Sequence, residues 1–305
     1  MLRPDDLYEI VDESVATGPA APPRVLVHAL DGFMDAGQAG RLTADHLLEV
    51  LESRVLARFD VDLMHDYRAR RPEVTFAEDR FIDYNPPELL LHLLVDDAGV
   101  EFLLLEGVEP YNHWNRFAGA VRQLIDRYNV TLTVGIHGIP MGVPHTRPLG
   151  LTAHATRPDL VTRSNIWDGE MRLPASAATM LQVRLGEAGR DAMGFAVHVP
   201  HYLADNRFPG AALALVHAIS AATGLLLPSK ALLDEAAITG RMVDEQVQAS
   251  DDASAVVNAL ETQYDAAAGS INRGSLLAAE SMPSGDEIGA ELEQFLAGLK
   301  RDDED

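Results

Sequence analysis

Residues 24–50 begin the fold with a strand, a glycine-rich loop and a helix. The apolar run 25–30 ends at Asp31-Gly32, and helical periodicity begins near Ala36. This order is typical of an α/β domain, where ligands gather at the ends of strands and the starts of helices. The segment therefore predicts an α/β fold, and the loop between this strand and this helix is the first place to look for a ligand site.

That loop has the glycines of a phosphate cradle but lacks its other residues. Gln38 and Ala39 stand where a P-loop needs lysine and a hydroxyl residue. The glycines within 32–40 are five and three apart, so they do not match the dinucleotide fingerprint either. Asp31 and Asp35 would also repel a phosphate group. We therefore interpret the loop as a tight turn in which Asp31 or Asp35 caps the next helix.

Composition excludes several classes of function. The chain of 305 residues has 24 basic and 47 acidic residues, a net charge of −23, which disfavours nucleic acid and anionic membranes as partners. It has no cysteine, which excludes disulfides, thiolate zinc sites and cysteine nucleophiles. Residues 1–14 have no apolar segment of a signal peptide, and the apolar run 89–95 is too short to span a bilayer. We expect a cytoplasmic protein.

Strand-like and helix-like segments alternate along the chain, which predicts a mostly parallel sheet flanked by helices. The expected strands cover residues 54–63, 101–105, 130–136, 150–155 and 192–199. The expected helices cover residues 88–97, 115–128, 176–188 and 211–223. Residues 66–87 are polar and rich in proline, and they predict a long excursion with a short hairpin around 74–76.

The pattern changes in the C-terminal part, where two apolar stripes at helical spacing predict a helical hairpin appended to the core. The stripes are Leu232, Ala236, Val243 and Val247, followed by Val256, Val257, Leu260 and Tyr264. The predicted organisation is a lead-in over 1–23, an α/β core over 24–226, the hairpin over 227–268, and an acidic, partly disordered tail over 269–305.

Several side chains are expected to meet where the parallel strands end. They are Asp31, Asp35, Glu109, Tyr111, His113, His137, His145, Arg147 and His201. Carboxylates and histidines in one crevice can carry out acid–base chemistry or hold a divalent metal. The same residues can instead have structural or protein-contact roles, and His28 and His198 within apolar strands are expected to be hydrogen-bonded core residues. The sequence has no standard catalytic or metal-binding motif, so no catalytic residue, metal or cofactor is assigned.

Four segments resemble the actinobacterial branch of the proteasome assembly chaperone 2 family. They are ALDGFMDAGQAG (29–40), GVEPYNHWNRFAGAV (107–121), VPHTRPLGLTAHAT (143–156) and VPHYLADNRFPGAALALVHAI (199–219). The resemblance covers roughly residues 24–265. It implies an α/β core similar to the phosphorylase/hydrolase-like fold, self-association up to a trimer, and a role like that of an assembly chaperone with proteasome subunits as partners. It supplies no catalytic residues.

Two segments depart from the family pattern. Related proteins can dock on proteasomes through a C-terminal hydrophobic-Tyr-X tail, whereas this sequence ends Asp-Glu-Asp. Residues 167–171, WDGEM, also stand where a Tyr-x-Gly-Pro-Thr-Gly-like turn is expected. The leading hypothesis is a non-catalytic homo-oligomeric assembly protein. The alternative is a small-molecule hydrolase or phosphorylase-like enzyme that uses the crevice carboxylates and histidines, and a weaker third is a scaffold with an acidic tail.

Overall fold

The computed structural model describes residues 3–18, 21–22, 24–32, 34–161 and 170–272. Contacts divide the chain into two compact units, Met1–Val257 and Asn258–Asp305. The sheet and its covering helices all belong to the first unit. In the second unit, the described part is the end of one helix.

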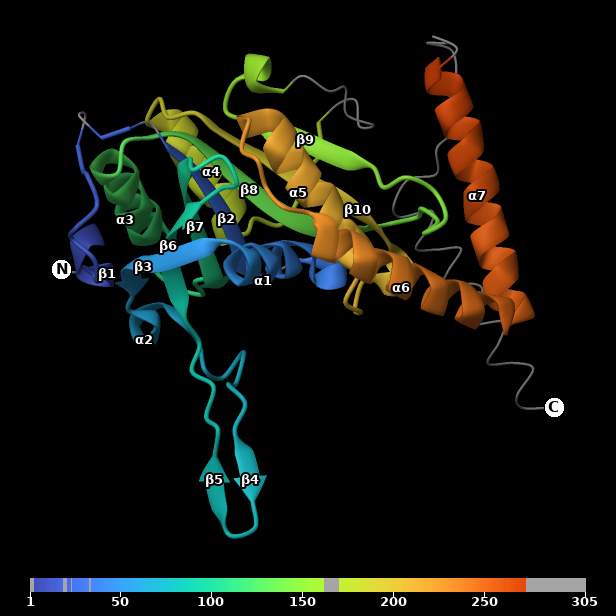
Figure 1. Ribbon diagram of the computed structural model, residues 1–305, viewed down its shortest axis with the longest axis horizontal. Coiled ribbons are helices and arrows are strands. Elements are labelled where there is room, and N and C mark those ends of the chain that lie inside the picture. The colour runs from blue at the N-terminus through green and yellow to red at the C-terminus, as the bar shows by residue number, and fades with distance from the viewer. Residues whose placement is uncertain (1–2, 19–20, 23, 33, 162–169, 273–305) are drawn as a thin grey trace. The chain divides into compact units, whose positions relative to one another are not determined.

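One eight-stranded sheet forms the centre of the first unit (Figure 1). Its strands are β1 (Tyr8–Ile10), β2 (Arg24–Asp31), β3 (Glu52–Phe59), β6 (Leu89–Val95), β7 (Glu101–Val108), β8 (Val130–Met141), β9 (Leu151–Ala155) and β10 (Ala192–Pro200). Their order is β1-β3-β6-β7-β2-β8-β10-β9. The central strands β7, β2, β8 and β10 are parallel, and the outer strands pair antiparallel with their neighbours. The predicted α/β sheet is confirmed, with its parallel part at the centre.

Helices cover both faces of this sheet. On one face, α3 (Trp114–Arg127) and α4 (Ala177–Glu187) bury Phe117, Val121 and Leu181 in one core. On the other face, α1 (Ala39–Val50) and α5 (Pro209–Thr223) bury Leu47 and Leu215 in a second core. The remaining short helices are η1 (Pro4–Leu7), η2 (Ala36–Gln38), α2 (Val61–Met64), η3 (Pro158–Leu160) and η4 (His201–Leu203).

The helix predicted over residues 88–97 is wrong, because this segment is strand β6. It lies between β3 and β7 and pairs antiparallel with both. Every residue from Leu89 to Leu94 is buried. A strand that is buried on both faces is apolar at every position, so it has no period of two that would separate it from a helix.

Both predicted C-terminal helices are present, as α6 (Lys230–Gln248) and α7 (Asp251–Asn272). Leu232 and Val243 of α6 are buried, so the predicted stripe faces the first unit. The pairing of the two helices as a hairpin and the predicted domain boundaries stay predictions. The acidic tail from residue 273 onward and residues 167–169 of the unusual turn lie outside the described residues.

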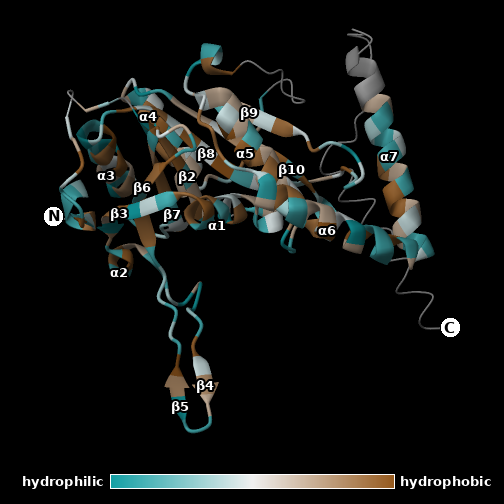
Figure 2. Cartoon of the chain, viewed as in Figure 1, coloured by the Kyte–Doolittle hydropathy of each residue, from teal (hydrophilic) through white to brown (hydrophobic). Residues whose placement is uncertain are grey.

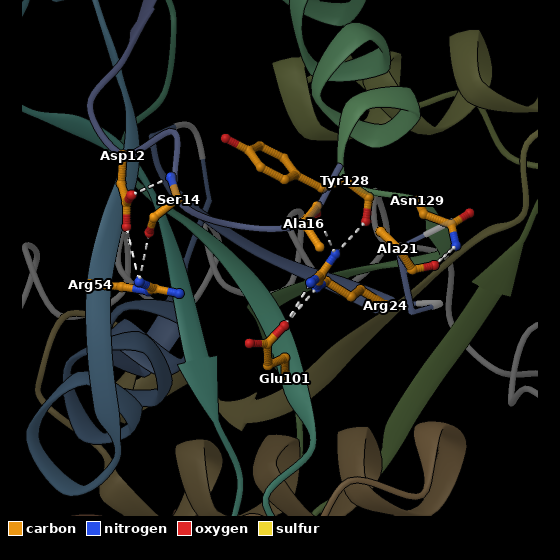
Figure 3. A network of polar contacts seen from close by, with 9 residues as sticks. All are labelled: Asp12, Ser14, Ala16, Ala21, Arg24, Arg54, Glu101, Tyr128 and Asn129. Atoms are coloured by element: carbon orange, nitrogen blue, oxygen red, sulfur yellow. Dashed lines mark hydrogen bonds and ion pairs between the residues drawn. The ribbon is translucent and has the colours of Figure 1, made fainter. Parts of the chain in front are cut away.

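The N-terminal segment is tied to the amino-terminal ends of the parallel strands (Figure 3). The guanidinium of Arg24 is 1% exposed and lies 2.6 Å from a carboxylate oxygen of Glu101. It also donates to the backbone carbonyl oxygens of Tyr128 at 3.1 Å and Ala16 at 3.3 Å. Leu7 is fully buried, and β1 adds an edge strand that the sequence pattern did not predict. Part of the predicted lead-in thus packs on the sheet.

A two-stranded hairpin projects from the carboxyl-terminal edge of the sheet (Figure 1). It consists of β4 (Thr75–Ala77) and β5 (Arg80–Ile82), and we call residues 73–84 the arm. The backbone N–H of Asn85 closes its base by donating to the carbonyl oxygen of Glu73 at 3.1 Å. The hairpin expected within 66–87 is confirmed.

Candidate functional site

The glycine-rich loop after β2 is held by one carboxylate. Asp35 Oδ1 accepts hydrogen bonds of 2.8 Å from the backbone N–H groups of Gly40 and Gly138, and Oδ2 accepts one of 3.0 Å from Arg41. The first turn of α1 is thereby capped and joined to the end of β8. Of the two acids that the sequence offered as the cap, Asp35 is the one that caps α1.

Two opposing effects act on the protonation of Asp35. Burial raises the pKa of its carboxyl group, and the three hydrogen bonds with backbone N–H groups lower it, with burial the larger effect. All three donors belong to the chain itself. Asp35 therefore acts as a structural bridge between the first turn of α1 and strand β8. Phe33 of the same loop lies outside the described residues.

Glu109 has a similar role at the start of another helix. Its Oε1 accepts a hydrogen bond of 2.5 Å from the backbone N–H of Ala177, the first residue of α4. A Cβ atom on Gly32 would overlap the Glu109 side chain, so glycine is required for this close approach. The backbone N–H of Glu109 also donates to the carbonyl oxygen of Asp31 at 3.0 Å. Glu109 thus links two strand-end loops to α4.

Asp31 lies in a polar pocket of about 400 Å³ at the ends of β2 and β7. Arg70 Nη2 lies 2.6 Å from Asp31 Oδ2, and Nη1 donates to the Asp31 carbonyl oxygen at 3.1 Å. Arg41 and Asp45 of α1 and Glu106 of β7 also line the pocket. The segments that lead into and out of the arm complete the lining of the pocket. They contribute Arg71, Pro72, Glu73, Asn85, Pro86, Pro87 and Glu88.

Tyr111 and His113 lie on the loop between β7 and α3. The exposed Tyr111 ring meets the His65 ring edge-on, with 5.6 Å between centroids. His113 precedes α3 with φ of 61°, and its Nδ1 lies 2.8 Å from the Arg116 guanidinium. The first contact joins this loop to the segment after α2, and the second lies at the start of α3.

His145, Arg147 and His201 lie on loops after β8 and β10. The side chain of His145 is only 4% exposed; its Nδ1 lies 2.7 Å from the hydroxyl of Tyr202, and its Nε2 lies 3.1 Å from a carboxylate oxygen of Asp244 on α6. His201 is exposed and meets the Tyr202 ring edge-on at 5.4 Å. Arg147 Nη1 lies 3.4 Å from the hydroxyl of its neighbour Thr146. This group ties the loop to α6.

His137 belongs to a group of histidines on the sheet face under α3 and α4. In the register of the sheet, His28, Gly135, Gly194 and His154 form one row across β2, β8, β10 and β9. Side chains on the two glycines would collide with the imidazoles of His28 and His154. Burial lowers the pKa of His28 and of His137 to about 4, and their neighbouring histidines add to the effect. These imidazoles are neutral at pH 7.

The prediction that His28 and His198 are core residues is confirmed, since they are 5% and 0% exposed, but the expected hydrogen bonding is incomplete. His198 Nε2 lies 2.8 Å from the hydroxyl of Thr152. Among the residues that the structure describes, Nδ1 of each of these two histidines has no hydrogen-bond partner. The expected hydrogen bonding is therefore observed at Nε2 of His198 and not at Nδ1 of either residue.

The profile of the PAC2 family matches residues 29–247, more than half of the chain. The chain belongs to the PAC2 family. This agrees with the family resemblance carried by the four sequence segments. No curated protein matches the chain.

Solved structures extend this comparison. A protein of unknown function from Mycobacterium tuberculosis is 43% identical, with a TM-score of 0.84 over 88% of this chain and 92% of that one. A protein of unknown function from Corynebacterium glutamicum is 36% identical, with a TM-score of 0.81 over 88% of this chain and 98% of that one. A proteasome-assembly chaperone homologue from M. tuberculosis is 24% identical, with a TM-score of 0.70 over 76% and 99% of the two chains, and it shows the common fold.

The candidate residues of this PAC2 chain thus lie in separate local groups. Asp31 faces the polar pocket, Asp35 and Glu109 bind backbone N–H groups, and His145 and His201 meet around Tyr202. Within the described ranges, no three histidine or acidic side chains are arranged to hold a metal ion. None of the described helices is long and apolar enough to span a membrane. Ligand binding by any of these residues stays a prediction.

Sequence reasoning missed the residues near the start of the excursion at 66–87 that contact Asp31 and line its pocket. Arg70 and His65 precede the arm, 39 and 34 positions after Asp31 in the chain, yet Arg70 pairs with Asp31 and His65 Nε2 lies 2.9 Å from the Arg70 carbonyl oxygen. The only available signal was the concentration of arginines in 68–71 beside a strand end. A motif search could not have found a pairing that depends on where the excursion folds back.

Proposed function

We propose that this PAC2 chain is a non-catalytic, cytoplasmic binding protein that self-associates, up to a trimer, and assists the assembly of other proteins, with proteasome subunits as candidate clients. The observation that carries the proposal is that Asp35 and Glu109, two of the candidate crevice carboxylates, accept hydrogen bonds from the backbone of the chain itself. A carboxylate that bridges buried backbone donors is poorly placed to transfer protons.

Family membership supports the same proposal, since PAC2 chains share their fold with a proteasome-assembly chaperone homologue from M. tuberculosis. The fold alone does not fix the function.

Affinity purification of the tagged chain from its native host under gentle conditions, followed by mass spectrometry, tests the proposal. We expect recovery of the chain together with at least one other protein, in which proteasome subunits are enriched over an untagged control. Multi-angle light scattering of the purified chain measures its self-association. Recovery of the chain alone would contradict an assembly role, and a monomeric mass would contradict self-association.

A second candidate function, a small-molecule hydrolase or phosphorylase-like enzyme, is favoured by the pocket at Asp31. Polar pockets at the carboxyl ends of parallel strands are common ligand sites. A thermal-shift screen of the wild type against a metabolite library tests this alternative, with Asp31→Asn and Glu106→Gln as pocket variants. A compound that stabilises the wild type but neither variant would favour it, and a screen without such compounds would count against it.

A further inference from the structure

The pocket at Asp31 brings together carboxylates from three different elements. Glu106 of β7 pairs in register with Ala29 of β2, and Asp31 follows Ala29 by two positions, so the three side chains point to the same face of the sheet. Helix α1 covers this face and contributes Asp45 to the pocket. Ala29 and Ala44, both buried, line the pocket beside these acids. The floor of the pocket therefore carries three carboxylates.

Two of these carboxylates keep binding capacity that the chain does not use. Asp31 is already paired with Arg70. Asp45, in contrast, lies 3.8 Å from the Arg41 guanidinium, which is too far for a direct hydrogen bond. Glu106 Oε1 lies 2.9 Å from His92 Nε2, and within the described residues its Oε2 has no hydrogen-bond partner. Asp45 and Glu106 can therefore accept hydrogen bonds from a ligand.

The electrostatics of the floor favour a cation. Burial raises the pKa of Asp45, and the negative charges of Glu106 and Asp31 raise it further, while Arg41 and Arg207 oppose the shift. A positively charged group beside Asp45 and Glu106 would relieve both the repulsion and the cost of burial. A phosphate or another simple anion would instead add to the repulsion.

The lining contributed by the excursion supplies charge of the opposite sign. Figure 2 shows mostly hydrophilic colouring on the segments that join the sheet to the arm. Arg71 lies on one of these segments, lines the pocket and is exposed, and it forms no ion pair with any residue that the structure describes. The pocket thus combines unused carboxylates on its floor with an unused guanidinium group from the excursion.

His65 provides a further unused group in the lining of the pocket. The residue is only 7% exposed, and its Nε2 lies 2.9 Å from the Arg70 carbonyl oxygen, so Nε2 carries the proton and donates it. Its Nδ1 is then an acceptor, and it has no partner among the described residues. A buried acceptor without a partner is uncommon in a folded protein, and a donor on a ligand would satisfy it.

We propose that this pocket binds a small zwitterion, a free amino acid or a dipeptide. Its ammonium group lies between Asp45 and Glu106, and its carboxylate pairs with the Arg71 guanidinium, a geometry that suits planar anions. The volume of about 400 Å³ is within the usual range for a site that holds a small molecule. The inference goes beyond the proposed assembly role and does not depend on it.

The experiment begins with thermal unfolding of the full-length chain in the presence of each standard free L-amino acid and of a set of X-Ala dipeptides. A bound probe at about ten times its Kd should raise the unfolding midpoint by about 2 °C or more. That probe is then compared with its N-acetyl form, which lacks the ammonium group, and with its C-terminal amide, which lacks the carboxylate. Isothermal titration calorimetry measures each Kd.

Three pocket variants and two controls of the full-length chain are titrated in the same way. The pocket variants are Asp45→Asn, Glu106→Gln and Arg71→Gln. The controls are Glu49→Gln on α1 and Arg122→Gln on α3, since both residues are exposed and neither lines the pocket. Circular dichroism checks that each variant is folded. Because Asp45 is 54% exposed, Asp45→Asn is expected to fold even if Glu106→Gln does not.

We expect each pocket variant to raise the Kd of the parent probe about tenfold or more, and each control to leave it unchanged. Arg71→Gln should not weaken binding of the amide form any further, because that form has no carboxylate to lose a partner. By the same reasoning, Asp45→Asn and Glu106→Gln should not affect the N-acetyl form.

The other outcomes overturn the inference. If no amino acid or dipeptide raises the unfolding midpoint, the pocket does not bind this class of ligand. If the N-acetyl form binds as tightly as the parent probe, the carboxylates do not recognise an ammonium group. If the controls weaken binding as much as the pocket variants do, the probe binds elsewhere. None of these results bears on affinity purification, so the proposed assembly role and the ligand site can each fail alone.

Discussion

Two loops leave the same edge of the sheet and use their residues in opposite ways. The loop at 31–40 places Asp35 against three backbone N–H groups and buries Ala36 and Gly37, so its polar group serves the fold. The arm at 73–84 places two phenylalanines in solvent. The difference teaches that a sequence motif of this family can mark the loop that holds the fold together, while the exposed aromatic surface lies in a segment without such a motif.

The largest expected effect is the loss of stability caused by Asp35→Ala. The change leaves the N–H groups of Gly40 and Gly138, both in buried residues, without their acceptor, and it should lower the free energy of unfolding by about 4 kcal/mol. Urea denaturation measures the effect. Asp45→Ala is the control, because Asp45 is more than half exposed and lies 3.8 Å from Arg41, and it should cost less than about 0.5 kcal/mol. Equal losses in the two variants would mean that Asp35 does not bridge the loop to β8.

The second test probes the close packing of the same loop on β8. A Cβ atom at Gly138 would overlap the carbonyl oxygen of Ala36, so Gly138→Ala should cost about 3 kcal/mol. Gly240→Ala in α6 should instead stabilise the chain by about 0.5–1 kcal/mol, because a Cβ there meets no atom within 4 Å and alanine favours helices. Thermal unfolding ranks the two variants. A Gly138→Ala variant as stable as the wild type would show that the loop can move away from β8.

The third test uses pH and the histidines under α3 and α4. The pKa of His28 is lowered to about 4 in the folded chain, so the unfolded state binds a proton first as the pH falls below about 6.5. The contribution of His28 to stability is thus fully present above about pH 6.5, and it is lost as the pH falls from about 6.5 toward about 4. At pH 5 the loss from His28 should be about 2 kcal/mol.

His28→Leu should remove this part of the pH dependence. The Nδ1 atom of His28 has no hydrogen-bond partner within the described residues, so at pH 7 the variant should be about as stable as the wild type. Urea denaturation at pH 7 and pH 5 gives the comparison. If the two chains lose equal stability between these pH values, His28 is not a buried neutral histidine.

The smallest effect on stability is expected in the arm. Phe76→Thr/Phe81→Thr should change the free energy of unfolding by less than about 0.5 kcal/mol, because both rings are mostly exposed and touch each other rather than a core. A loss of more than about 2 kcal/mol that grows with protein concentration would show that the rings are buried in an assembly of this chain with itself.

Much of the fold could be predicted from the sequence, because its helices carry clear apolar stripes and its central strands are continuous apolar runs. The failures have physical reasons. Strand β6 is apolar at nearly every position, so periodicity could not separate it from a helix, and β1 has only three residues. At the site, the capping role of Asp35 follows from local chemistry, whereas the pairing of Asp31 with Arg70 depends on the path of an excursion that no local pattern describes.

The place of β2 in the sheet also has a consequence for synthesis of the chain. Strand β2 is made early, but its two neighbours are β7, which begins at Glu101, and β8, which begins at Val130. At translation rates of about 5–20 residues per second, roughly 5–20 s pass between the emergence of Asp31 and that of Val130. For most of this interval, until β7 emerges, Leu26 and Val27, both buried in the finished sheet, have neither neighbouring strand to pair with. The centre of the sheet is therefore the segment that a ribosome-associated factor has most reason to shield.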